Sequence, residues 1–559
     1  MPSENDLTFY NLKERRWLTR LDRGSIVGHT TSNDTKLWFR FKSKGNYLLV
    51  ISKTSLKNDV EDKPKKYDES YTRFSKKYNE EMSLHCAIEV NVDGISDFTY
   101  VLDTFNNSSI SKLHADTIYY YGAYNLDEDN WEIGVENSHS FRTMPENESN
   151  KSWDISFGLY SCHMPFDPKN QSTADSSMWD LMEKELKFSN AKFVLGGGDQ
   201  VYTDGVDYLN IWNWLKTVKD KNPTVKDMYS WYRDIYRGYW GFPGVQAVHR
   251  QFPNYMMWDD HEIMDGWGSY TKKELSNELD SIFEWENEKQ NLKLAKDMFK
   301  AATYVYKEYQ HSHNPVRSEV EDCYDYDFSS CGSDFFALDM RAKRDYDNNY
   351  TILGKKQISR FKSWAKELGN SNNTGPIFVL STVPMVHLKD FVSNLFDWVG
   401  VFGARDDVRD HWAHEKHGKE FLQILNIIFK TSHNTNRPLV VLSGDVHIGG
   451  VFKLFSDDKK YENANVFQLT SSAITYAALG PLKMNLLAKA TVEKGVIGKQ
   501  TKKGATFSFK RELIFPQYNF SIINYKTEEE KTTQINIELI GKSDDSRVKE
   551  SVRLNLLDL

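Results

Sequence analysis

The chain has 559 residues, of which 39% are hydrophobic and 27% charged, and its formal net charge at pH 7 is −8. This length exceeds that of one typical hydrophobic core and predicts about two to four domains. The acidic balance, without a basic stripe in the sequence, gives no support for a nucleic-acid partner.

Signals for membrane insertion or export are not found in this sequence. No stretch is apolar over the length that a membrane-spanning helix needs, and Met1–Leu7 lacks the basic start and apolar centre of a secretory signal. We therefore expect a cytoplasmic protein, and an extracytoplasmic location stays open if a signal was removed. The four cysteines are too few for a disulfide framework, although Cys323 and Cys331 could form one pair.

The first quarter of the chain has the pattern of a β-sandwich. Residues 1–20 form a polar N-terminal extension, and residues 21–145 alternate short runs of Tyr, Val, Ile and Phe with turn residues. This alternation predicts an antiparallel sandwich of the immunoglobulin or fibronectin type III kind, interrupted by a charged surface insertion at Lys53–Glu81. The predicted strands are Lys36–Phe41, Tyr47–Ser52, Leu84–Val92, Thr99–Leu102, Thr117–Tyr124 and His139–Thr143.

After a polar linker at residues 145–151, the pattern changes to apolar strands that alternate with helices. The predicted strands are Ile155–Tyr160, Phe193–Leu195, Tyr255–Trp258, Phe335–Leu338, Ile377–Leu380 and Leu439–Leu442. The predicted helices are Ser176–Phe188, Val225–Tyr239, Glu274–Tyr309, Lys355–Leu368 and Glu420–Lys430. Strands that are apolar throughout are covered on both faces, so residues 151–559 are expected to form a four-layer α-β-β-α domain. Residues 482–559 would complete this domain with strands such as Asn519–Tyr525 and Thr533–Leu539. The predicted fold class is therefore multidomain α/β (α+β).

Four of these apolar strands are followed at once by side chains with oxygen, nitrogen or sulfur donors. The donors are Cys162 and His163 after Ile155–Tyr160, Asp199 and Tyr202 after Phe193–Leu195, Asp259–Glu262 after Tyr255–Trp258, and Asp445 and His447 after Leu439–Leu442. Ligands collect beyond the strand ends of such sheets, so this recurrence predicts a metal site. The remaining histidines, among them His249, His387, His411, His414 and His417, are interpreted as surface or packing residues.

The motifs together resemble the PhoD-like alkaline phosphatases, a branch of the calcineurin-like metallophosphoesterases. The resemblance lies in Ser161-Cys162, Gly198-Asp199-x-x-Tyr202-x-Asp204, Trp258-Asp-Asp-His-Glu262, Asp339-Met-Arg341-x-x-Arg344 and Ser443-Gly-Asp-Val-His447, and more loosely in Asp410-His-Trp412. It covers about residues 20–480 in the family's order.

The resemblance implies a set of roles at these positions. Asp199 would bridge two cations, Cys162, Tyr202 and His447 would complete an Fe(III) site, and Asp260 and Asp445 would hold Ca(II). Thiolate and phenolate suit Fe(III), whereas carboxylates suit calcium. Asp204 or Asp259 would serve a further calcium or support the ligands, and zinc, manganese or magnesium remain alternatives to these metals. His261 would be the catalytic non-ligand, and Arg341 would bind phosphate or form an ion pair with Asp339 or Asp345.

The expected activity is hydrolysis of small phosphate mono- or diesters by a hydroxide held on two cations. One alternative is a phosphodiesterase of the purple acid phosphatase kind, since Asp199-x-x-Tyr202 also fits a phenolate–iron centre. Another is an inactive metal-binding protein of the same fold, and a third is an unrelated α/β enzyme with Cys162 as its nucleophile. The sequence does not set the oligomeric state.

Overall fold

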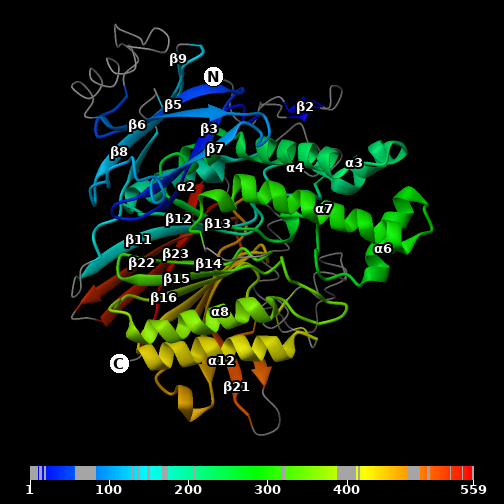
Figure 1. Cartoon of the computed structure of the whole chain (residues 1–559). Helices are drawn as coiled ribbons and strands as arrows, with labels where there is room; N and C mark the ends of the chain where they lie inside the picture. The colour runs from blue at the N-terminus through cyan, green and yellow to red at the C-terminus, as the bar shows by residue number, and fades with distance from the viewer. Residues whose placement is uncertain are drawn as a thin grey trace.

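The computed structural model describes residues 10–11, 16–17, 20–56, 84–128, 130–134, 139–147, 152–166, 174–205, 209–316, 322–386, 411–412, 414, 416–475, 492–499, 504–528, 531–543 and 546–556. Most of the predicted N-terminal extension and of the insertion Lys53–Glu81 lies outside these residues. The same is true of residues 148–151 of the linker, of His387 and of Asp410. Across the described residues the fold is mixed α/β, as the sequence predicts (Figure 1).

The N-terminal part contains two antiparallel sheets, with strand orders β3-β4-β7 and β10-β8-β5-β6, and β9 pairs with β8. The strands are β3 (Gly24–Thr30), β4 (Thr35–Arg40), β5 (Gly45–Ser52), β6 (Leu84–Val92), β7 (Thr99–Asp103), β8 (Ile118–Asn125), β9 (Asn130–Ile133) and β10 (Ser140–Arg142). Two further short strands, β1 (Tyr10–Asn11) and β2 (Arg16–Trp17), pair with each other. Both larger sheets contribute to one core, in which Phe39 of β4 meets Tyr121 of β8 edge to face.

This N-terminal part is joined to the rest of the molecule by buried contacts. Trp38 of β4 is fully buried, and its indole Nε1 donates to the carbonyl of Glu308. The Lys36 ammonium donates to the carbonyl of Asn314 at 2.9 Å. A Cβ on Gly28 would lie 2.4 Å from the carbonyl oxygen of His313, so only glycine fits there. The two parts therefore share a close-packed seam.

Two large sheets make up the rest of the structure. The six-stranded sheet has the order β13-β12-β11-β22-β23-β24, and the eight-stranded sheet has the order β14-β15-β16-β17-β19-β18-β21-β20. The first comprises β11 (Trp153–Tyr160), β12 (Val194–Gly197), β13 (Asn254–Met257), β22 (Phe520–Glu528), β23 (Lys531–Ser543) and β24 (Ser546–Arg553). The second comprises β14 (Tyr326–Ser330), β15 (Ser333–Leu338), β16 (Ile377–Ser381), β17 (Leu439–Ser443), β18 (Gly449–Ser456), β19 (Val466–Thr470), β20 (Lys494–Lys499) and β21 (Thr506–Phe515).

Alternating side chains hold these two sheets against each other and against helices. Phe157 of β11 contacts Phe335 and Phe378 of the eight-stranded sheet, with ring centroids 5.7 and 5.0 Å away. Phe336, on the opposite face of β15, contacts Phe361 and Trp364 of the helix α8 (Gly354–Glu367). Successive strand residues point to opposite faces, so β15 is covered on both sides. Burial of both faces explains why the strands of this part are apolar at nearly every position.

Helices pack against both sheets, with contacts of α2 (Ser177–Phe188) to β22 and of α12 (Gly418–Thr435) to β17, β19 and β20, and in Figure 1 α8 and α12 run side by side. The helices are α2 (Ser177–Phe188), α3 (Ile211–Val218), α4 (Val225–Trp240), α5 (Pro243–His249), α6 (Lys272–Phe283), α7 (Glu288–Tyr309), α8 (Gly354–Glu367) and α12 (Gly418–Thr435). Short 3₁₀ turns include η4 (Asp260–Glu262) and η5 (His311–His313). No helix within the described ranges combines the length and apolarity that crossing a membrane requires.

One predicted helix is wrong in its extent. The sequence pattern indicates a single helix over Glu274–Tyr309, but the structure has α6 and α7 with a break between them. Glu284 and Glu286 adopt left-handed backbone angles, with φ of 54° and 47°. Asn287 then caps α7 by accepting a hydrogen bond from the Gln290 amide. The chain turns here because residues in the left-handed region cannot continue an α-helix.

Candidate metal centre

The candidate site lies where the parallel strands β11, β12 and β13 end at one edge of their sheet. The turn after β11 is held to the turn after β12 by two backbone hydrogen bonds, Cys162 N–H to Gly198 O and His163 N–H to Asp199 O. The turn after β17, in the other sheet, packs directly against them. Its Gly444 lies so close to Ser161 that a Cβ at this position would be 2.4 Å from the Ser161 hydroxyl. The topology therefore brings residues of both sheets to one place.

Asp199 is the centre of a group of contacting donors. Its Oδ2 accepts from the Cys162 thiol at 3.3 Å and from the Tyr202 hydroxyl at 3.4 Å. The same Tyr202 hydroxyl lies 3.3 Å from Nε2 of His447. These four side chains come from three separate strand ends and form one connected cluster. Three of them are the residues expected to hold Fe(III) together with Asp199.

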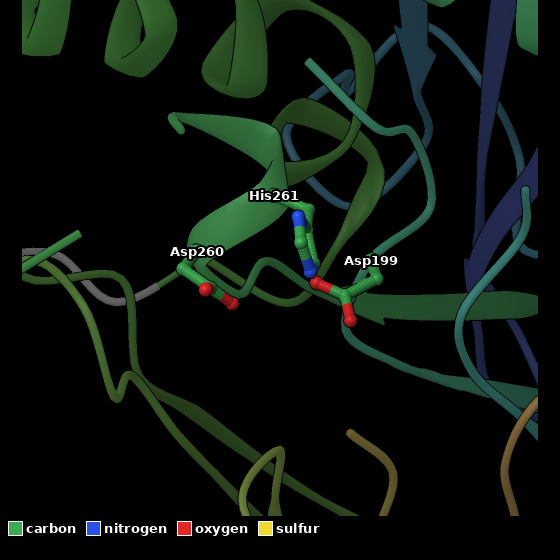
Figure 2. A group of neighbouring side chains, drawn as sticks. All are labelled: Asp199, Asp260 and His261. Carbon is green, nitrogen blue, oxygen red and sulfur yellow. The ribbon is translucent and has the colours of Figure 1, made fainter. Parts of the chain in front are cut away.

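Asp260 and His261 approach this cluster from η4. Ligand atoms of Asp199, Asp260 and His261 all lie within 4.8 Å of one another, and Figure 2 shows the three side chains converging. Geometry therefore permits His261 as a ligand, whereas the sequence assigns it a catalytic role. Asp445 contacts the cluster through its backbone carbonyl, which accepts from the Cys162 thiol at 3.8 Å.

The backbone at this site is strained at several of the predicted ligands. Cys162, Asp199, Asp445 and His447 have φ values of 58°, 56°, 67° and 54°. Residues other than glycine rarely adopt this left-handed backbone region, and those that do are concentrated at functional sites. The side chains of Cys162, Asp199 and His447 leave these left-handed turns and meet in the cluster.

The chemistry of the donor set fits a cation. Oδ1 of Asp199 is buried and has no hydrogen-bond partner among the described residues. Burial raises the pKa of Asp199 well above its usual value, and the nearby carboxylates of Asp260 and Asp259 raise it further. Burial, and then the charge of Asp199, also raise the pKa of the Cys162 thiol. A cation among these groups would stabilise their charged forms and so reverse both shifts.

His447 is prepared to donate a lone pair. Burial lowers its pKa from 6.5 to about 3, and the charge of His261 acts in the same direction. The imidazole is therefore neutral at physiological pH, which is the form that binds metals.

Glu262 connects the turns that carry the ligands. Its carboxylate accepts from the backbone amides of Asp199, Gln200 and Asp259 at 3.1, 2.7 and 2.8 Å, and from the side chain of Gln310 at 3.0 Å. Burial raises the pKa of this carboxyl to about 7. The sequence indicates Glu262 only as support for its neighbours, whereas the structure shows it bonded to the turns after both β12 and β13.

His261 is oriented by a carboxylate on the far side of its ring. Its Nδ1 lies 2.7 Å from Oδ1 of Asp204, and its ring packs against that of Tyr202 with centroids 4.1 Å apart. Burial lowers the pKa of His261, but the charges of Asp204, Asp260 and Asp199 outweigh it and raise the pKa well above 6.5.

Arg341 is fully buried and lies next to the site, against Asp259 and Asp260. Its guanidinium contacts Asp259 through Nε and lies 3.2 Å from Oδ1 of Asp260. The sequence indicates Asp339 as one ion-pair partner, but the Asp339 carboxylate instead accepts from Trp258 and from backbone amides, including that of Arg341.

Other candidates lie elsewhere or escaped the sequence argument. His163 is buried against Trp179 and Tyr239, outside the cluster. Ser472, whose hydroxyl donates to the Cys162 sulfur at 3.1 Å, was not among the predicted residues. It follows β19, a strand that the sequence analysis did not identify, so no pattern pointed to it.

Comparisons with known proteins identify relatives in sequence. A family profile described as PhoD-like phosphatase matches residues 157–533. The uncharacterized protein YGR266W of Saccharomyces cerevisiae is 22% identical over 419 residues, which cover 60% of this chain and 56% of the yeast protein. The chain thus spans little more than half the length of that curated relative.

Solved structures give a likeness in fold. A structure titled as that of PhoD has 15% sequence identity, a TM-score of 0.58, and coverage of 95% of this chain and 89% of its own. A purple acid phosphatase from yellow lupin (Lupinus luteus) seeds, with 10% identity, a TM-score of 0.47 and coverage of 96% and 74%, is more distant.

Proposed function

The chain belongs to the PhoD-like phosphatase family, and we propose on this premise that it is a metal-dependent hydrolase of small phosphate mono- or diesters. The observation that carries the proposal is the connected cluster of Cys162, Asp199, Tyr202 and His447 with His261 beside it. Family membership supplies the reaction class, and the donor set supports the metal dependence.

In this proposal, Asp199, Cys162, Tyr202 and His447 would hold Fe(III), and Asp199, Asp260 and Asp445 would hold a Ca(II) ion. Thiolate and phenolate donors suit the first metal, and carboxylates suit the second, with zinc, manganese or magnesium as alternatives. When bound, two such cations would supply the positive charge that activates water and neutralises phosphoryl oxygens.

His261 is the proposed catalytic residue of the chain itself. With Nδ1 engaged by Asp204, its other ring nitrogen faces Asp199 and can donate a proton to the leaving oxygen. The raised pKa keeps that proton available. Asp204 would act through His261 by fixing the orientation and protonation of the ring, which makes it a positioning residue.

Arg341 is proposed as a positioning residue rather than a phosphate ligand. Its guanidinium is fully buried and lies against Asp259 and Asp260, so its charge offsets the repulsion between these adjacent carboxylates. The contact also fixes one oxygen of Asp260, while Oδ2 of Asp260 accepts from the Gly266 amide.

We also infer the domain organisation from the contacts between sheets. The shared core of the two N-terminal sheets supports a β-sandwich over residues 21–145. The contacts of Phe157 and Phe336 support a four-layer α-β-β-α domain over residues 151–559. Pairing of β22 with β11 supports a C-terminal region, residues 482–559, that completes this domain.

Two substrates and one variant test the proposal. The purified chain should hydrolyse p-nitrophenyl phosphate, bis-p-nitrophenyl phosphate or both, and elemental analysis should find metal. Asp199→Asn should lose metal together with more than about 10²-fold in turnover, because even outer residues of metal sites contribute 10–100-fold. Hydrolysis of the diester alone would favour the phosphodiesterase alternative. Metal without turnover on either ester would indicate an inactive metal-binding protein, and turnover without metal would refute the proposal.

A further inference from the structure

A cavity lies outside the candidate metal centre, at the start of α8 and α12. It has a volume of about 840 Å³ and is bordered by the loop at residues 349–354, by the first turns of both helices and by Lys343. None of the predicted metal ligands lines it. α8 packs on the face of the eight-stranded sheet that points away from the six-stranded sheet.

The lining of this cavity is strongly cationic, although the chain as a whole is acidic. Six basic side chains border it against a single carboxylate, that of Glu420. The basic residues are Lys343, Lys355, Lys356, Arg360, Lys416 and Lys419. Glu420 is already engaged, because it accepts from the backbone amides of Ile352 and Leu353 at 2.9 and 2.7 Å.

Several of these cations have partners that hold them at the cavity wall. Arg360 is paired with Asp325, and Lys416 lies over the rings of Tyr346 and Tyr350 at 4.1 and 4.8 Å. The ammonium of Lys343 lies 3.7 Å from Asp322.

Lys355 and Lys419 differ from the cations that are held in this way. Within the described part of the chain, neither has a carboxylate within ion-pair distance. They come from different helices and border the same cavity, so one anion can be reached by both. Lysine ammonium groups act as compact point charges with three donors each and suit phosphate oxygens.

We propose that this cavity binds a soluble ligand that carries two or more phosphate groups. Its volume lies within the range of small-molecule sites, about 300–1,000 Å³. The excess of cations calls for a multiply charged anion, and the ring of Tyr350, which borders the cavity, can cover an apolar part of the ligand. The proposal is independent of the phosphoesterase activity, because the cavity shares no residue with the metal centre.

Calorimetric titration with methylenediphosphonate, a diphosphate analogue that resists hydrolysis, tests this site in the full metal-loaded chain. We expect saturable one-to-one binding that persists in Asp199→Asn, which removes the contribution of the metal centre. The double change Lys355→Gln/Lys419→Gln should raise Kd at least about tenfold, while Lys355→Arg/Lys419→Arg should bind nearly as the parent does. The matched control Lys226→Gln/Lys300→Gln, on exposed positions of α4 and α7, should leave Kd unchanged.

Each other result overturns the proposal. Equal weakening in the cavity and control variants would mean unspecific attraction to surface lysines, and loss of binding in Asp199→Asn alone would assign the ligand to the metal centre. Flotation with phosphatidylserine vesicles that depends on Lys355 and Lys419, without binding of the diphosphonate, would assign the cavity to a lipid headgroup. Unfolding temperatures within a degree or so of the parent exclude misfolding of the variants.

Discussion

At the residue scale, His261 and Asp204 form the pair whose roles can be separated by kinetics. His261→Ala should keep its metal and lose roughly 10²–10⁴-fold in kcat, the usual size of an acid–base contribution. Asp204→Asn should lose about 10–100-fold, as expected for a residue that only orients another. Turnover with both esters and metal content per chain are the measurements.

The pH profile distinguishes positioning from structural support. If Asp204 acts through the imidazole of His261, Asp204→Asn should move the alkaline limb of the kcat profile to lower pH, because a carboxylate that raised the pKa is gone. A profile unchanged in shape would leave Asp204 a purely structural role. Loss of metal in His261→Ala would instead make His261 a ligand, which the geometry also permits.

The sequence predicted which candidate residues lie together, but it did not predict the hydrogen bonds that connect their turns. Cys162, Asp199, Tyr202 and His447 were expected together because each follows an apolar strand, and the structure brings them together. The four amide and side-chain contacts of Glu262 were not foreseeable. They depend on the register of β12 and β13 and on left-handed backbone turns, which residue types alone do not specify.

At the scale of elements, Asp97 fastens the N-terminal sheets to α4 and α7. Its carboxylate pairs with Arg237 of α4 at 2.6 Å and with Arg40 of β4 at 3.3 Å, and it accepts from Tyr309 of α7. Although burial raises the pKa of Asp97, these two guanidinium groups outweigh it and hold the pKa below its usual value. The carboxylate is therefore ionised at neutral pH.

Asp97→Asn should destabilise the chain by about 3 kcal/mol, because it leaves the buried guanidinium of Arg40 without its counter-charge and that of Arg237 with Asp234 alone. Urea denaturation followed by tryptophan fluorescence measures the cost at the first transition. Asp154→Asn is the matched control, since the pair of Asp154 with Lys526 is 60% and 41% exposed and should contribute below about 1 kcal/mol. Equal costs for the two changes would contradict the fastening role.

The break between α6 and α7 shows which helix boundaries a sequence can indicate. The break between α6 and α7 could have been found from Asn287, since an asparagine three residues before a polar side chain is a helix-capping signal. The left-handed angles of Glu284 and Glu286 carry no such signal, because glutamate normally favours helix. The helical pattern therefore predicted one continuous helix across this break.

At the scale of the whole molecule, the seam between the N-terminal sheets and η5 makes the fold sensitive to acid. Burial lowers the pKa of His313 from 6.5 to about 3 and that of His311 to about 4, and the charge of Lys36 acts in the same direction on both. Between these folded-state pKa values and pH 6.5, the two histidines bind protons only in the unfolded chain. Their burial therefore does not reduce the free energy of unfolding above pH 6.5, but reduces it progressively as the pH falls below 6.5.

At pH 5 the neutral state of His313 should cost the fold about 2 kcal/mol relative to pH 7.5, from 1.36 kcal/mol per pH unit below 6.5. His313→Gln should reduce the loss of stability between these pH values by about that amount. Denaturation midpoints of the parent and the variant at both pH values measure the difference. A parallel loss in the two chains would place the acid sensitivity elsewhere.

The mixed α/β character was predictable from the length and apolarity of the strands, but the pairing of distant strands was not. β11 pairs on one side with β12 and on the other with β22, which begins at Phe520. Local patterns report which face of a strand is buried and give no information on its neighbour. Partner choice therefore required the structure.

This pairing has a consequence for biosynthesis. The ribosome completes β11, β12 and β13 by residue 257, yet the second neighbour of β11 emerges only at residues 520–528. In the interval the nascent chain has an open, apolar strand edge, which favours association with other chains. A protein truncated before residue 520 by a premature stop codon should therefore be bound by chaperones and degraded by proteases, even if it contains every predicted metal ligand.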